Sequence, residues 1–157
     1  MGQLLVVEDH PPLATVVAIG LRRSGHEVVR VGSVERARSC RGTFDCAVID
    51  FDLPDGSGVD LARELFDSGR TRSVVFYTAS RDASLRNEAQ ALGPIVDKMG
   101  NLEELLSVVG QELEALDAER EQAGAEERVQ AVGDVTLPAA RPSGRSGMRR
   151  RVRRGLR

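Results

Sequence analysis

The amino-acid sequence predicts an α/β domain built on a five-stranded parallel sheet, followed by a charged segment. Short apolar runs alternate with amphipathic stretches along the chain, which is typical of the strand and helix units of a parallel sheet. With 157 residues, 41% of them hydrophobic, the chain can form one domain of ordinary size with residues to spare. Acidic residues end two of the apolar runs, where a parallel sheet gathers its ligand-binding loops.

Five apolar runs are expected to form the strands of this sheet. In chain order they are QLLVV (3–7), EVVRV (27–31), DCAVID (45–50), SVVFYT (73–78) and PIVD (94–97). Each run is short and rich in β-branched residues, as strands buried between two layers of helices are.

The segments between the strands are expected to form helices. The first begins near Pro11 and Pro12, because proline is well tolerated in the first helical turn. The last begins after Asn101, which pairs with Glu104 as a helix cap, and its apolar stripe runs as far as Leu116. Three glycines mark the expected ends of earlier helices, namely Gly25, Gly69 and Gly93.

Charge divides the chain into an acidic body and a basic end. Residues 141–157 carry eight arginines and no acid, whereas the other 140 residues carry 14 basic and 24 acidic side chains. We expect a folded domain over 1–118, a charged helical extension or linker over 119–137, and an arginine-rich disordered tail over 138–157. The extension is either solvated or paired with another helix. The 141–157 segment supports only weak, non-specific attraction to nucleic acid.

The remaining composition indicates a soluble protein of the cytoplasm. The two cysteines, Cys40 and Cys46, lack metal-binding or redox spacing, and no secretory signal is recognisable at the start of the sequence. No apolar run approaches the roughly 20 residues that a membrane-spanning helix needs.

Chemically active side chains follow the expected strands at one edge of the sheet. Three carboxylates brought together there would repel one another, and Mg²⁺ with its preference for oxygen ligands would relieve the repulsion. A hydroxyl and an ammonium beside them can hold a phosphoryl group, and an aspartate can be the nucleophile that accepts it. The residues concerned are Glu8, Asp9, Asp50, Asp52, Thr78 and Lys98, with Asp50 as the central candidate.

Lys98 is the only lysine in a chain with 22 basic residues. Arginine therefore serves wherever a general positive charge is needed. A compact ammonium reaches into a small site as a point charge, whereas a planar guanidinium needs a wider partner. This singles out Lys98 as a site residue.

These residues resemble the receiver domain of two-component response regulators. The resemblance covers about residues 3–118 and rests on Glu8 and Asp9 after LLVV, Asp50 within VIDFDLPDGSG, Thr78 within VVFYTAS, and Lys98. It implies a flavodoxin-like, doubly wound sheet with strand order 2-1-3-4-5 and five flanking helices. It also implies a bacterial phosphorelay protein.

The family resemblance assigns a role to each acid. Asp50 would accept a phosphoryl group from a phosphohistidine on a sensor histidine kinase or a histidine phosphotransfer protein. Asp9 and Asp50 would bind Mg²⁺ directly, Glu8 through water, and Asp52 through its backbone carbonyl.

The resemblance also implies how the signal is passed on. Thr78 and Lys98 would bind the phosphoryl group, and the movement of Thr78 would bias a surface formed by the fourth helix, fifth strand and fifth helix. No output domain is visible, so we expect a single-domain regulator that acts by contact with a downstream protein, with homodimerisation as an option. Beyond its own phosphorylation and dephosphorylation, no enzyme activity is expected.

Two positions depart from the family pattern. Met99 stands where a proline, joined by a cis peptide bond, usually follows the lysine, so this bond is expected to be trans and Lys98 to be placed differently. Ile95 stands where the family has a tyrosine or phenylalanine that turns inward with the switch. Phosphorylation is expected to be retained and its readout altered.

Two alternative functions remain open. The segment FDCAVIDFDLPDG also resembles the first motif of haloacid-dehalogenase-type phosphatases, although Pro54 and the early position of Glu8 and Asp9 do not fit that family. The other alternative is a receiver-like interaction module that is not phosphorylated, favoured by Ile95 and Met99.

Overall fold

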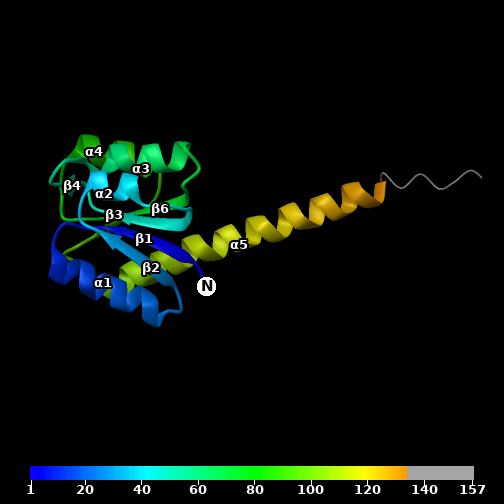
Figure 1. Cartoon of the computed structure of the whole chain (residues 1–157), viewed down its shortest axis with the longest axis horizontal. Coiled ribbons are helices and arrows are strands. Elements are labelled where there is room, and N and C mark those ends of the chain that lie inside the picture. The colour runs from blue at the N-terminus through cyan, green and yellow to red at the C-terminus, as the bar shows by residue number, and fades with distance from the viewer. Residues whose placement is uncertain (134–157) are drawn as a thin grey trace, which may run out of the picture.

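The computed structural model describes residues 1–133 and contains a five-stranded parallel sheet with helices on both faces (Figure 1). Its strands are β1 (Gln3–Val7), β2 (Glu27–Val31), β3 (Phe44–Ile49), β6 (Thr71–Thr78) and β7 (Ile95–Asp97). They lie in the order β2-β1-β3-β6-β7, and every neighbouring pair is parallel. Counted along the chain, this is the order 2-1-3-4-5, so the predicted flavodoxin-like fold is confirmed.

Five helices cover the sheet, as predicted. Helices α1 (Pro11–Arg23) and α5 (Leu102–Gly133) lie on one face, and α2 (Val34–Ser39), α3 (Gly58–Asp67) and α4 (Ala83–Gln90) lie on the other (Figure 1). Successive residues of a strand point to opposite faces of the sheet and contribute to two separate hydrophobic cores, one on each face. Leu5 and Val7 of β1 pack towards α2 and α3, whereas Leu4 and Val6 pack towards α1 and α5.

A short hairpin between β3 and α3 was missed by the sequence analysis. Strands β4 (Asp52–Leu53) and β5 (Gly56–Ser57) pair antiparallel within the DLPDGS loop, with Asp52 opposite Ser57. Two residues carry too little alternation to be read as a strand from sequence. The hairpin fixes the chain immediately after Asp50.

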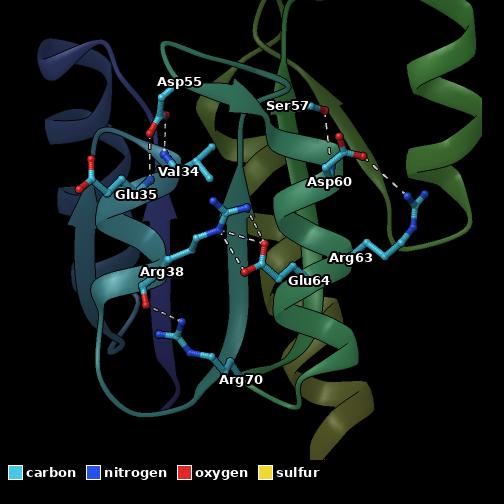
Figure 2. Close-up of polar contacts among 9 residues, drawn as sticks. All are labelled: Val34, Glu35, Arg38, Asp55, Ser57, Asp60, Arg63, Glu64 and Arg70. Carbon is cyan, nitrogen blue, oxygen red and sulfur yellow. Dashed lines mark hydrogen bonds and ion pairs between the residues drawn. The ribbon is translucent and has the colours of Figure 1, made fainter.

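Helix α2 has only six residues, and side chains from outside it hold both of its ends. The Asp55 carboxylate accepts hydrogen bonds from the N–H groups of Glu35 and Val34, which lower the pKa of Asp55 (Figure 2). At the other end, the Arg70 guanidinium donates to the carbonyl oxygens of Ala37, Arg38 and Cys40. Partners distant in sequence therefore stabilise a helix too short to be stable alone.

Replacing Arg70 with methionine is expected to lower the free energy of unfolding by about 2 kcal/mol, because several carbonyl oxygens at the end of α2 lose a charged donor. Denaturant unfolding of the full chain measures the change. Arg72→Met is the matched control, since Arg72 is an exposed arginine two residues further along, on β6. Equal stability of the two variants would contradict the assigned role of Arg70.

Helix α5 begins as predicted and continues beyond the sheet. The Asn101 side chain accepts a hydrogen bond from the N–H of Glu104 at 2.9 Å, and the apolar stripe is buried as far as Leu116. Beyond it the helix projects away from the domain (Figure 1). Residues 119–133 of the expected extension are helical, and the expected tail of 138–157 lies outside the described residues. Within residues 1–133, no helix is both long and apolar enough to cross a membrane.

His26, just before β2, should make stability depend on pH. Burial lowers the pKa of His26, and its Nδ1 accepts a hydrogen bond from the Gly2 N–H at 3.1 Å. The folded chain therefore favours neutral His26. This contribution to stability is present above the ordinary histidine pKa of about 6.5 and is lost as the pH falls through the lower folded value.

Urea unfolding at about pH 7.5 and about pH 5.5 tests this prediction. The free energy of unfolding should fall less over this interval in His26→Asn than in the parent, because asparagine keeps an acceptor and does not titrate. Identical pH dependence of the two chains would show that His26 does not contribute.

Candidate functional site

Five predicted site residues come together at the carboxyl edge of the sheet. The strand register sets Val7 opposite Ile49, Ile49 opposite Phe76, and Thr78 opposite Asp97. The residues at the ends of these strands therefore lie side by side at the carboxyl edge of the sheet. They are Glu8 and Asp9 after β1, Asp50 after β3, Thr78 at the end of β6, and Lys98 after β7.

Three of these residues form a cluster of carboxylates. Glu8, Asp9 and Asp50 each offer an oxygen, and these oxygens lie within 4.8 Å of one another. Glu8 and Asp50 are buried, whereas Asp9 is exposed. An all-oxygen donor set of this size suits a hard divalent cation such as Mg²⁺.

Lys98 lies against two of the three acids. Its Nζ is 2.6 Å from Glu8 Oε2 and 2.6 Å from Asp50 Oδ2, and the Lys98 side chain is only 16% exposed. The backbone holds it there, because the Lys98 N–H donates to the Thr78 carbonyl oxygen at 3.0 Å. The bond to Met99 is trans, as predicted, and Met99 points into solvent at 81% exposure. The Lys98 ammonium lies within the acidic cluster although no proline follows it.

The cluster carries more negative than positive charge. Burial raises the pKa of Glu8 and outweighs the effect of the nearby ammonium. Burial also opposes the charge of Lys98, but hydrogen bonds to Asp50 and Glu8 more than compensate, so the pKa of Lys98 is raised. One ammonium against three carboxylates leaves an excess charge of −2, which a divalent cation would balance.

Thr78 is fully buried, and its hydroxyl is engaged with its own loop. Its Oγ1 accepts a hydrogen bond from the Ser80 N–H at 3.1 Å. A hydroxyl that turned towards Asp50 would give up this bond, and the loop after β6 would have to move with it. Ile95 of β7 lies opposite Phe76 of β6. Its side chain is half-buried and packs against the core on the side of the sheet that α3 and α4 cover.

The loop after Asp50 is fixed by a close approach at Gly58. The Gly58 N–H donates to the Phe51 carbonyl oxygen at 2.8 Å, and a Cβ on Gly58 would lie only 1.7 Å from the Asp50 carbonyl oxygen. Only glycine allows the start of α3 to lie this close. Asp52 is exposed, and its N–H is 3.4 Å from Asp50 Oδ1.

Sequence reasoning did not single out two arginines beside the acids. Arg30 and Arg36 line a cavity of about 190 Å³ together with Glu8 and Asp9. The only signal in the sequence was the position of Arg30 close to the end of a strand. The sequence also did not predict the ion pair between Glu8 and Lys98, because the position of each side chain in space decides which acid the lysine contacts.

Comparison with known proteins places the chain in a family. The sequence model of the response regulator receiver domain matches residues 4–110. The chain belongs to this family. The receiver is 39% identical over 93 residues to the transcriptional regulatory protein CutR of Streptomyces coelicolor, a match that covers 58% of this chain and 43% of CutR. It is 38% identical over 93 residues to the two-component response regulator PhoP of Pseudomonas aeruginosa, covering 58% of this chain and 41% of PhoP.

A solved structure shows the same fold. The response regulator TrrA of Thermotoga maritima, in complex with Mg²⁺ and BeF, aligns with a TM-score of 0.65 at 25% identity, covering 72% of this chain and 100% of TrrA. The receiver matches less than half the length of the two curated regulators.

Proposed function

We propose that the receiver takes part in phosphorelay signalling by accepting a phosphoryl group on Asp50. The observation that carries this proposal is the buried Asp50 carboxylate, which lies within an acidic cluster and against the Lys98 ammonium. An Asp50 oxygen would attack the phosphorus of a donor phosphohistidine. The new O–P bond forms as the P–N bond breaks, and the leaving imidazole takes the electron pair.

Mg²⁺ is the proposed cofactor of this transfer. Asp9 and Asp50 would hold it directly, Glu8 through water, and Asp52 through its carbonyl oxygen, consistent with the spacing of the three carboxylates. The cation would neutralise the negative charge of the incoming phosphoryl group and of the acids. The related TrrA has been solved with Mg²⁺ and BeF bound.

Thr78 and Lys98 would hold the transferred group. The Lys98 ammonium already contacts Asp50 Oδ2 and would pair with a phosphoryl oxygen. Thr78 would exchange its bond from Ser80 for a bond to the phosphoryl group and draw the loop after β6 inward. Because Ile95 has no ring to follow this movement, the readout on the β7 side differs from that of receivers with an aromatic residue there.

The proposed setting is a bacterial cytoplasm. A sensor histidine kinase or a histidine phosphotransfer protein would donate the phosphoryl group, and a downstream protein or a second copy of the chain would read the altered surface. The family match and the resemblance to CutR and PhoP support this role. The receiver would act as a phosphoacceptor that turns over only its own phosphate.

Mass spectrometry after incubation with Mg²⁺ and a small-molecule phosphodonor tests the assignment of Asp50. The parent chain is expected to gain one phosphoryl group, and Asp50→Asn to gain none, because an amide is a far weaker nucleophile than a carboxylate. Asp60→Asn is the matched control, since Asp60 is an exposed acid on α3. Labelling of Asp50→Asn at the parental level would refute the assignment.

Two alternatives predict other outcomes in the same assay. A receiver-like interaction module, which Ile95 and Met99 favour, would remain unlabelled although it is folded. A phosphatase of the haloacid-dehalogenase type would release phosphate steadily from a generic ester. A single Mg²⁺-dependent labelling event excludes both.

A further inference from the structure

A second cavity lies at the opposite end of the sheet from the acidic cluster. Its volume is about 380 Å³, and it is enclosed by the residues before β1 and β2, the start of β3 and the middle of α5. We call it the basal cavity. Its lining is partly apolar and partly acidic, with Leu106, Leu113 and Leu116 among the apolar residues and Asp45, Glu114 and Asp117 as the acids.

The acids of the basal cavity differ in how far their charge is compensated. Asp45 accepts from the Gln3 N–H at 2.9 Å and from Arg120 at 2.8 Å, so its carboxylate is satisfied. Glu114 and Asp117 are exposed on α5. Asp117 lies 4.0 Å from Arg120, and Glu114 forms no hydrogen bond or ion pair within residues 1–133. Arg120 and the amino-terminal residue Met1 also line the cavity, so the three acids leave it only a small excess of negative charge, which Glu114 presents to solvent.

Gly110 helps to keep the cavity open. It lies in the interior of α5, where glycine destabilises a helix relative to alanine. A Cβ at this position would meet nothing within 4 Å, so no neighbouring atom requires glycine there. The missing side chain instead leaves room in the wall of the basal cavity, which Gly110 lines.

The chain itself contains a segment with complementary chemistry. Within the arginine-rich residues 145–157, Met148, Val152 and Leu156 follow one another at intervals of four. Such spacing would bring the three apolar side chains to one side of a helix, with arginines around the rest. An apolar stripe flanked by arginines matches a cavity with leucines in its wall and carboxylates on its rim.

The length of the connecting chain permits the segment to fold back. The helix from Asp117 to Gly133 is about 24 Å long at 1.5 Å per residue. The residues between Gly133 and Met148 can span roughly 45 Å when extended. We propose that residues 145–157 dock intramolecularly on the basal cavity, with Met148, Val152 and Leu156 towards the leucines and arginines towards Glu114 and Asp117.

The negative charge of α5 makes the α5 helix of a second copy an unfavourable occupant of the basal cavity. Residues 117–131 carry five acids and two arginines, so two such helices side by side would repel one another. A basic partner is favoured, and residues 145–157 belong to the same chain, so that their docking would be an intramolecular event with a high effective concentration. Docking would also neutralise the arginines and reduce their attraction to nucleic acid.

NMR spectra of the ¹⁵N-labelled full chain test the proposal through the backbone amide signals of Gly110, Glu114 and Asp117. Raising the salt concentration from about 20 mM to about 500 mM should shift these signals as the docked segment is released. The triple variant M148S/V152S/L156S should show the high-salt positions at both concentrations. V135S/L137S is the matched control, because it removes two apolar side chains outside the arginine-rich segment.

Charge variants on α5 provide an independent test. E114Q/D117N should lose the salt-dependent shift of Gly110, whereas E126Q/E127Q, with the same change in charge farther along α5, should retain it. Parental signals in the triple serine variant, or equal losses in a test variant and its control, would overturn the proposal. Loss of the shift on tenfold dilution would overturn the intramolecular contact in favour of docking by a second copy.

Discussion

Replacing Gly58 with alanine is expected to lower the free energy of unfolding by about 3 kcal/mol and to slow phosphoryl uptake by Asp50. The added Cβ would lie 1.7 Å from the Asp50 carbonyl oxygen and 3.0 Å from a methyl carbon of Ile49. Overpacking of a close-packed interior costs about 1–3 kcal/mol, and a clash with backbone is at the upper end because no rotamer relieves it. The start of α3 or the chain at Asp50 has to move.

Denaturant unfolding and the rate of phosphoryl uptake measure the two effects. Gly124→Ala is the matched control, because it makes the same change in a helix where the nearest neighbouring atom, Arg128 Nη2, lies 3.8 Å from the new Cβ. It should stabilise the chain by up to about 1 kcal/mol through helix propensity. A Gly58→Ala chain as stable as the parent would show that the approach of α3 to Asp50 is not required.

Replacing Lys98 with methionine should have two large effects. Phosphoryl uptake is expected to slow by about 100-fold or more, because a positioned charge that stabilises the transferring group is lost. In the absence of Mg²⁺, the free energy of unfolding should fall by about 3 kcal/mol, because Glu8 and Asp50 lose a cation that lies 2.6 Å from each. Methionine keeps much of the apolar stem, so packing changes little.

Added Mg²⁺ should restore much of the stability of Lys98→Met and give it a larger gain than the parent. Unfolding measured with and without Mg²⁺ provides this comparison. Arg81→Met is the matched control, since Arg81 pairs with Asp97 at 2.9 Å on the surface, where a lost ion pair has little effect. If Mg²⁺ stabilised all three chains equally, Lys98 and the cation would not share the same carboxylates.

The strands could be predicted from sequence because their signal is local. Runs such as QLLVV are apolar throughout, as strands covered on both faces are, and the strand ends fell within two residues of the predicted positions. The β4–β5 hairpin was missed because two-residue strands have no period. The capping of α2 by Arg70 was missed because it joins residues about 30 positions apart.

The sequence predicted which residues form the candidate site, but not which of them form ion pairs with one another. Strand order alone brings Asp9, Asp50 and Lys98 to one edge, since the carboxyl ends of parallel strands share it. Met99 suggested a different placement for Lys98. The backbone bond from Lys98 to Thr78 continues the β6–β7 ladder past the strand end, and it sets the lysine beside Asp50 without a proline.

Helix α5 is one continuous helix, so a small change in its tilt would displace its C-terminal end by a larger distance. Its first half packs on the sheet. Its second half, which the Arg120–Asp45 ion pair fastens to the base of the sheet, projects for about 24 Å from Asp117 to Gly133. A tilt of about 10° at the sheet would therefore swing the distal turn by roughly 4 Å. A small movement near Lys98 that tilted α5 would therefore produce a larger displacement at the contact between the projecting end of α5 and a partner protein.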